Sequence, residues 1–333
     1  MPELRLNLIT KEWVIIATER AKRPEDFITT VERKVLPPYV ETCPFCSGNE
    51  AKTPDEVFRL EHDNQWLIRI VPNKFSALSR TGQRERINDG LKHNVSGVGV
   101  HDVLIETPMH NLTTAFLPTG QIENIIGAYR RRFMDIYNDP RIEHVIIFKN
   151  HGEGAGTSLQ HPHSQIIGTP LTAFHIRDRL EQAMRFFDTT GQCLMCKTIE
   201  DEKTDGIRVI LETEHFITFI PYAALSAFHI WIFPKRHFAA FSDITGQEIA
   251  DLAGNLKTTL SKLYYGLDNP DFNYVIRSNS PEDSGSEYFH WYISIVPRVS
   301  KTAGFELGSG MYINTALPEQ SAEFLRNVTP PVA

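Results

Sequence analysis

The stretch His161-Pro-His-Ser-Gln165 is the most informative part of this chain. Its first histidine completes a set of two cysteines and two histidines that begins at Cys43-Pro-Phe-Cys46 and includes His110. The chain then repeats the pattern. The second copy consists of Cys193-Leu-Met-Cys196, His237 and His290-Trp-Tyr292. The middle and last histidines are 51 residues apart in the first copy and 53 in the second. Two cysteines and two histidines at matched intervals, present twice, predict a duplicated unit with a metal site in each half.

Composition narrows the class of protein. The 333 residues are 41% hydrophobic and 23% charged, which is typical of a globular chain with one large domain or two ordinary ones. A net charge of −7 without a long basic run excludes a binder of duplex nucleic acid, but not a nucleotide substrate. The chain has no run of about 18 apolar residues and no signal-peptide pattern at its start. We therefore expect a cytoplasmic protein whose partners include neither nucleic acid nor membrane.

Other features repeat together with the cysteines and histidines. In each half an apolar run ends at a proline, and a second apolar run precedes the middle histidine. A helical pattern then opens at Thr119-Gly-Gln in one half and at Thr245-Gly-Gln in the other, and further strand patterns follow. We predict an α+β fold of two histidine-triad-like halves, 1–172 and 173–333, each an antiparallel sheet with packed helices. The polar segment 79–97 has no counterpart and predicts a long surface loop.

The cysteine pairs point to metal chemistry. All four cysteines lie in Cys-x-x-Cys pairs, which in a large cytosolic chain indicate a metal or redox site and not a disulfide framework. One such pair alone could be two buried thiols or a redox pair, but the matched histidines favour tetrahedral zinc. His229 competes with His237 as a ligand, and the sequence leaves that choice open. We expect two zinc ions per chain, with the ligand sets Cys43, Cys46, His110, His161 and Cys193, Cys196, His237, His290.

The two halves differ at the last position of the pattern, where the first has His163 and the second has Tyr292. In a strand that begins at His163, the side chains of His163 and Gln165 point to one face. An imidazole that is largely unprotonated at neutral pH is a good nucleophile, and the Gln165 amide can donate to phosphoryl oxygens. We predict that both residues are catalytic. The alternative for His163 is a structural histidine or a further metal ligand.

Phosphate-binding candidates flank these histidines. Glycines before His161 can let backbone N–H groups approach a phosphate, and a serine adds a hydroxyl donor, although most such turns are only turns. A basic cluster near the N-terminus is a solvated surface or a diphosphate clamp. An asparagine after Pro72 either caps a turn or contacts a base. The predicted substrate-binding residues are Asn150, Gly156, Thr157, Ser158, Arg20, Arg23 and Asn73.

At these residues the chain resembles the galactose-1-phosphate uridylyltransferase family of the histidine-triad superfamily. The similarity runs over nearly the whole length and includes residues 12–24, 43–46, 106–110, 161–165 and 304–306. It implies two fused antiparallel-sheet halves, which carry the zinc ligands and phosphate contacts named above. It also implies a homodimer in which the partner's segment from Lys301 to Glu306 completes the site, with Glu306 contacting hexose hydroxyls.

The resemblance further implies a reaction. His163 would attack the α-phosphorus of a nucleoside diphosphate sugar or related nucleotide, and a nucleotidyl-histidine would form. A sugar phosphate or phosphate would then take the nucleotide, in ping-pong order. The first expectation is transfer of a uridylyl group between UDP-glucose and a hexose 1-phosphate.

Several departures from the family pattern leave the base and the acceptor open. Arg277 and Tyr292 stand where the best-studied members hold a second metal, Tyr312 replaces an expected glutamine, and Thr157 stands where a cysteine is frequent. The second Cys/His set resembles the adenylyl-transferring branch, so the alternative is adenylyl transfer by an ADP-forming sulfate adenylyltransferase or an ADP-glucose phosphorylase. A hypothesis of another class is a non-catalytic, zinc-stabilised nucleotide-binding protein, against which the retained His163 and Gln165 speak.

Overall fold

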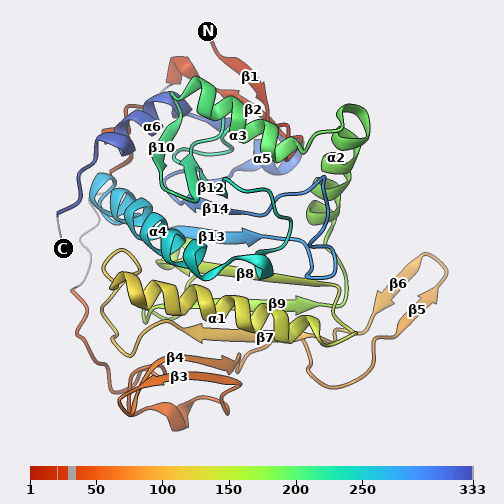
Figure 1. Cartoon of the computed structure of the whole chain (residues 1–333), viewed down its shortest axis with the longest axis vertical. Helices are drawn as coiled ribbons and strands as arrows, with labels where there is room; N and C mark the ends of the chain where they lie inside the picture. Colours follow the sequence, from red (N-terminus) through yellow and green to blue (C-terminus); the bar gives the residue numbers. More distant parts are fainter. Residues whose placement is uncertain (21, 29–34, 332–333) are drawn as a thin grey trace.

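A ten-stranded antiparallel sheet runs through the molecule (Figure 1). The computed structural model describes the chain except residues 21, 29–34 and 332–333. The strands follow the order β10-β11-β12-β14-β13-β8-β9-β7-β4-β3. Their bounds are β3 (Phe58–His62), β4 (Gln65–Pro72), β7 (Val100–Ile105), β8 (His144–His151), β9 (His163–Thr169), β10 (Val209–Glu212), β11 (Phe216–Phe219), β12 (Ile230–Pro234), β13 (Phe272–Arg277) and β14 (Tyr292–Pro297).

The sheet is assembled from two five-stranded halves. Strands β3, β4, β7, β9 and β8 come from the N-terminal part of the chain, and β13, β14, β12, β11 and β10 come from the C-terminal part. The halves join edge to edge where β8 pairs with β13. Each half contains the predicted succession of strand, strand, helix, strand and strand, so the α+β class and the antiparallel sheets are confirmed. The two predicted sheets form one continuous sheet.

Two long helices, α1 (Thr119–Tyr137) and α4 (Gly246–Gly266), cover one face of this sheet (Figure 1). Their apolar residues recur at helical spacing and are buried in the largest core cluster together with alternate residues of the strands. Thr245 caps α4 through a capping box, because its hydroxyl accepts from Glu248 N–H and the Glu248 carboxylate accepts from Thr245 N–H. The helical patterns predicted at Thr119 and Thr245 are thus confirmed.

The opposite face of the sheet is covered differently in its two halves. In the C-terminal half, α2 (Phe174–Thr190) and α3 (Leu194–Asp205) pack against it in a second apolar cluster. In the N-terminal half a small cluster around Cys43, Cys46 and Val103 lies on that face. Strand side chains alternate between faces, so Ile166 of β9 packs toward α1 while His163 and Gln165 point to the opposite face.

Smaller elements complete the fold. A three-stranded sheet contains β1 (Glu3–Leu6), β2 (Trp13–Ile16) and β15 (Tyr312–Asn314), near α5 (Gly304–Ser309) and α6 (Pro318–Asn327). Short 3-10 helices are η1 (Thr18–Arg20), η2 (Pro24–Phe27), η3 (Glu50–Lys52), η4 (Glu153–Ala155) and η5 (Phe241–Asp243). The segment 79–97, predicted as a loop, contains the projecting hairpin of β5 (Arg86–Asp89) and β6 (Lys92–Val95) (Figure 1). No helix in the described part of the chain has both the length and the apolar composition to cross a bilayer.

Candidate active site and metal centres

The first predicted ligand set comes together in the structure. The ligand atoms of Cys43, Cys46, His110 and His161 all lie within 4.8 Å of one another, and all four residues are buried. Cys46 Sγ lies 3.5 Å from His110 Nδ1 and 3.7 Å from His161 Nδ1. His161 donates from Nε2 to the Thr107 carbonyl at 2.8 Å, which leaves the Nδ1 lone pair directed at the cysteines.

The second set is more open. The ligand atoms of Cys193, Cys196 and His237 lie within 4.8 Å of one another, with His237 exposed. His290 is buried and its Nδ1 lies 3.4 Å from Cys196 Sγ, but it falls outside that mutually close group. His229 is not part of the group either; its Nε2 lies 2.8 Å from Ser294 Oγ. The geometry therefore favours His237 over His229 beside this cysteine pair.

The chemistry of both sets fits zinc. Two soft thiols with borderline imidazoles are the donor types that tetrahedral zinc takes, and the first set offers four of them in a closed, buried arrangement. In the second set the hydrogen bond from Cys196, followed by that from His237, holds the pKa of Cys193 below its usual range, which favours a thiolate ligand. His237 Nε2 lies 3.2 Å from the Ser286 carbonyl, so its Nδ1 is available to a metal. Both sets are therefore possible metal sites consistent with zinc.

His163 lies next to the first set with one ring nitrogen already occupied. His163 donates from Nδ1 to the main-chain carbonyl of His161 at 2.8 Å, so in the neutral ring the lone pair is on Nε2. The Phe45 ring packs edge-on against the imidazole, with ring centroids 5.6 Å apart. Burial, followed by the charge of Lys149, lowers the pKa of His163 and so favours the unprotonated ring.

A buried ion pair supports the backbone at this histidine. Lys149 Nζ donates to Glu106 Oε2 at 2.6 Å and to the His163 carbonyl at 3.3 Å, and both side chains are fully buried. Removing either partner would leave an uncompensated buried charge. The sequence prediction assigned no role to Lys149, because a lysine near the end of a strand has no pattern that marks it as buried.

His101 is a second residue that the sequence prediction missed. Its Nδ1 accepts from Ala77 N–H at 3.3 Å, so Nε2 of the neutral ring carries the proton and donates to Gln165 Oε1 at 2.7 Å. Asn73 Nδ2 lies 3.0 Å from the same nitrogen. The Gln165 oxygen is thereby fixed toward His101, which turns its NH₂ group the other way. The alternation His101, Val103, Ile105 along β7 could have placed His101 on the face of Gln165.

The glycine-rich segment 152–156, which precedes His161, forms a tight turn after β8. Gly152 and Gly156 have φ of +85° and +86°, a conformation that favours glycine. Gly154 N–H donates to Asp271 Oδ2 at 2.6 Å, and the N–H groups of residues 155, 156 and 157 donate to carbonyls within the turn. The N–H groups of residues 154–157 are thus used within the protein in this conformation. Asn150 lies at the start of the turn, where its Oδ1 accepts from Asn273 Nδ2 at 2.7 Å.

The remaining predicted contacts lie elsewhere in the chain or outside the described part. The side chain of Arg20 lies outside the described residues, and Arg23 is exposed. Lys301 is exposed, and the Glu306 carboxylate accepts from Ala303 N–H at 2.9 Å at the start of α5. Figure 1 places α5, the helix that contains Glu306, beside the three-stranded sheet and away from β9, the strand that begins at His163.

Comparisons with known proteins bear on this arrangement. Residues 1–172 match the family described as "Galactose-1-phosphate uridyl transferase, N-terminal domain". The chain is 36% identical to the ADP-glucose phosphorylase of Arabidopsis thaliana, over 98% of this chain and 93% of that one. It is 27% identical to the galactose-1-phosphate uridylyltransferase of Thermotoga maritima, over 98% of both.

Solved structures of the same two kinds of enzyme are similar to this chain over nearly its whole length. The crystal structure of the Arabidopsis thaliana ADP-glucose phosphorylase with bound ADP-glucose superposes with a TM-score of 0.83 at 33% identity, covering 99% of both chains. A uridylyltransferase structure superposes with a TM-score of 0.75 at 26% identity, covering 98% of this chain and 97% of that one. This chain belongs to the galactose-1-phosphate uridyl transferase family.

Proposed function

We propose that this nucleotidyltransferase works through a covalent nucleotidyl-histidine formed at His163 Nε2. The observation that carries the proposal is the hydrogen bond from His163 Nδ1 to the His161 carbonyl, which leaves the other nitrogen free to attack. The lowered pKa of His163, which burial causes, supports attack by the unprotonated ring at neutral pH.

The reaction then divides into two displacements at one phosphorus. The Nε2 lone pair of His163 forms a bond to the α-phosphorus of a nucleoside diphosphate sugar, the bond to the bridging oxygen breaks, and a sugar phosphate leaves. An oxygen of a second phosphate next forms a bond to the same phosphorus, and the nitrogen–phosphorus bond breaks. Throughout, Nδ1–H stays on the ring, where the His161 carbonyl stabilises the positive charge of the substituted imidazole.

Neighbouring side chains would orient the phosphates. The Gln165 NH₂ group, turned away from His101, can donate to a non-bridging oxygen as charge develops. Asn150 is opposite His163 when the register of β8 and β9 is extended by two residues beyond the pair Phe148 and Gln165. Zinc bound by Cys43, Cys46, His110 and His161 would hold the His161 carbonyl in place, a structural contribution. Ser158, Arg20 and Arg23 remain proposed phosphate contacts, and Asn73 a proposed contact to the nucleotide.

Adenylyl transfer from ADP-glucose, or a related adenylyl donor, to phosphate is the reaction we place first. It is supported by the 36% identity to an ADP-glucose phosphorylase and by the Cys/His set of the C-terminal half. Uridylyl transfer between UDP-glucose and a hexose 1-phosphate, which the sequence alone put first, is the second candidate. It is supported by the family match over residues 1–172 and by the Thermotoga maritima relative.

A competition between donors tests this assignment. The zinc-loaded protein is mixed with equal concentrations of ADP-glucose and UDP-glucose, and either phosphate or galactose 1-phosphate is added. Release of ADP and glucose 1-phosphate with phosphate as acceptor supports the first reaction, whereas formation of UDP-galactose supports the second. If neither donor is consumed by the protein, both assignments fail.

The assembly is part of the proposal. Because α5 and β9 lie apart within one chain, we propose a homodimer in which the Lys301–Glu306 segment of each chain serves the other chain's site. We also propose that residues 1–172 and 173–333 are the two duplicated units. Sedimentation at micromolar concentration, followed by mixing of His163→Ala and Glu306→Ala chains, tests sharing: mixed dimers regain activity only if the sites are shared.

A further inference from the structure

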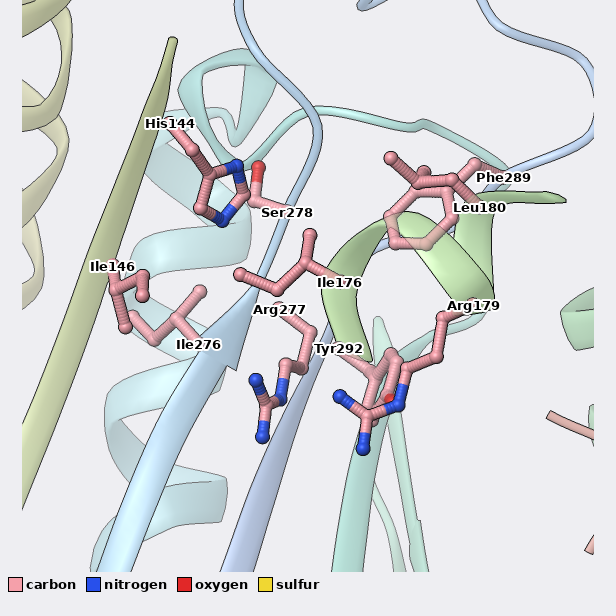
Figure 2. Close-up of a pocket in the computed structure, with 10 residues that line it drawn as sticks. All are labelled: His144, Ile146, Ile176, Arg179, Leu180, Ile276, Arg277, Ser278, Phe289 and Tyr292. Atoms are coloured by element: carbon pink, nitrogen blue, oxygen red, sulfur yellow. The ribbon is translucent and has the colours of Figure 1, made fainter. Parts of the chain in front are cut away.

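A second cluster of polar groups lies in the cavity shown in Figure 2, where β8 of the N-terminal half meets β13 and α2 of the C-terminal half. It is on the sheet face opposite α1 and α4, beneath helix α2. Two arginines dominate its lining: Arg179 from α2 and Arg277 from the end of β13. Figure 2 shows their guanidinium groups next to each other at one end of the cavity, with Tyr292 beside them. The cavity does not include His161, His163 or Gln165.

Neither arginine has a partner that explains its position. Arg179 Nε and Nη1 are buried and have no hydrogen-bond acceptor. Among the described residues, the side chain of Arg277 has no hydrogen bond or ion pair, and the groups that raise its pKa, Tyr292 and Glu12, act on it through their charge alone. Buried donors without acceptors, such as these two of Arg179, are rare in native proteins, and the neighbouring positive charge of Arg277 adds repulsion. The arrangement is therefore costly unless an acceptor with negative charge joins it.

The charges around the pair do not supply that acceptor. Burial, followed by the charge of Arg179, lowers the pKa of Arg277 to about 10. The nearby imidazoles of His144 and His229 have pKa values of about 4 and 3, lowered first by burial, and add no negative charge. Glu12 is the carboxylate that acts on Arg277, but its Oε2 is buried without a hydrogen bond, and no ion pair joins it to either arginine within the described residues. A net positive charge remains in the cavity.

The internal repeat shows which part of the N-terminal half corresponds to this cavity. In the N-terminal half, β9 begins at His163, and extending its register with β8 by two residues beyond Phe148 and Gln165 puts Asn150 opposite it. In the C-terminal half, β14 begins at Tyr292, and the register with β13 places Arg277 opposite it. Tyr292 thus replaces the proposed nucleophile, and Arg277 replaces the proposed phosphate contact. The place where the first half would hold a phosphate carries a cation pair in the second half.

We propose that this cavity binds a tetrahedral oxyanion between the guanidinium groups of Arg179 and Arg277, either free phosphate or the phosphate group of a sugar phosphate. Planar guanidinium groups bind phosphate oxygens in pairs, and the Tyr292 hydroxyl, beside them in the cavity, can add a third donor. The bound anion would tie α2 to β13 and β14. The site goes beyond the proposed function, because it contains no nucleophile and is separate from His163.

Thermal unfolding with and without anion tests the site. The full-length protein is heated in sodium phosphate, in glucose 1-phosphate, and in sodium chloride of equal ionic strength. We expect Tm of the wild type to rise by about 4 °C at roughly 100 times the dissociation constant. Arg277→Met should lose most of that rise, and Arg179→Met should do the same. Without phosphate both variants should melt at or above the wild-type Tm, because each removes a like-charge repulsion.

Two controls fix the location. Arg185→Gln changes an exposed arginine on the same helix, one that lies 3.7 Å from Glu181, and should keep the full phosphate effect. His163→Ala should also keep it. A phosphate effect of full wild-type size in both Arg277→Met and Arg179→Met overturns this proposal, whether or not it persists in His163→Ala. Equal Tm in phosphate and chloride overturns it too, and a rise with glucose 1-phosphate alone identifies the ligand as a phosphate monoester.

A crystal soaked in selenate gives a direct view of the same site. The anomalous signal of selenium should peak between the two guanidinium groups in the wild type and be absent there in Arg277→Met. A wild-type crystal with selenate peaks elsewhere but none at this pair contradicts the proposal, whatever the outcome of the donor experiments at His163.

Discussion

His163 donates from Nδ1 to the main-chain carbonyl of His161 at 2.8 Å, and His161 itself belongs to the first metal set. The metal-binding turn and the proposed nucleophile are therefore joined through one residue. Its side chain directs Nδ1 at the cysteines, while its carbonyl decides which nitrogen of His163 carries the proton. Disturbing the metal set should thus disturb the tautomer of His163 as well as the fold.

Replacing His163 should separate chemistry from stability. His163→Ala removes the proposed nucleophile, and we expect kcat to fall by roughly 10⁴-fold or more. Tm should fall far less than in a zinc-ligand variant, because the buried imidazole makes one hydrogen bond and packs against the Phe45 ring. Steady-state rates and calorimetry check both parts. His93→Ala, on the exposed hairpin, is the matched control and should keep wild-type rates; near-normal turnover in His163→Ala would contradict the mechanism.

Removing one thiol should cost both zinc and stability. Cys43→Ser breaks the buried four-residue set, and structural zinc contributes on the order of 10 kcal/mol of folding free energy in small zinc domains. We expect metal analysis to fall from two zinc ions per chain to one, with a marked drop in Tm. The exposed neighbour Ser47→Ala should retain both ions. A Cys43→Ser chain that keeps two zinc ions at wild-type Tm would rule out this ligand set.

His101 should act on the reaction through Gln165. His101→Ala removes the donor that holds the Gln165 carbonyl, so the amide can rotate and present its oxygen to the phosphate. We expect kcat to fall by about 10- to 100-fold, less than the roughly 10²- to 10³-fold of a deleted transition-state donor because Gln165 is still present, with KM changed less. His101→Gln, whose NH₂ can still donate, should recover part of the rate. A change in KM alone, with kcat intact, would argue against a positioning role.

The buried His144 predicts a loss of stability in acid. Burial, then the charge of Arg277, lowers its pKa to about 4, whereas an unfolded chain protonates this ring near pH 6.5. The unfolded state therefore binds the proton first, and stability falls as the pH drops from about 6.5 toward 4. Between pH 7 and pH 5 the wild type should lose about 2 kcal/mol through this residue. In urea unfolding, the free energy of unfolding of His144→Gln should fall by about 2 kcal/mol less than that of the wild type between pH 7 and pH 5. His62→Gln, which changes an exposed histidine, should lose as much stability as the wild type.

The elements that the sequence predicted are those whose pattern is local. The alternation along residues 163–168 and the helical spacing after Thr119 and Thr245 depend on periods of two and 3.6, and the structure contains these elements. The first ligand set could also be predicted from the sequence, because the duplicated spacing of cysteines and histidines identifies its four residues. The joining of two half-sheets through β8 and β13 was not, since no local pattern specifies which edge strands meet.

Other parts of the site depend on contacts between segments far apart in sequence. His101 and Gln165 are 64 positions apart, and only the register of β7 and β9 brings them together. Lys149 looks like a surface lysine until its pairing with Glu106 is seen. The hairpin within 79–97 is polar and exposed, so it lacks the apolar alternation by which strands are recognised. His290 was predicted as a ligand from spacing, and its exact fit depends on a loop geometry that spacing does not define.

Trapping the covalent intermediate tests the central claim most directly. The protein is mixed with ADP-glucose or UDP-glucose labelled at the α-phosphorus, without an acceptor, then quenched and digested for peptide mapping. The account predicts one acid-labile, base-stable label per chain, on the peptide that contains His163, lost on adding the acceptor and absent from His163→Ala. Turnover without a labelled His163 peptide, or a label that persists in His163→Ala, would contradict it.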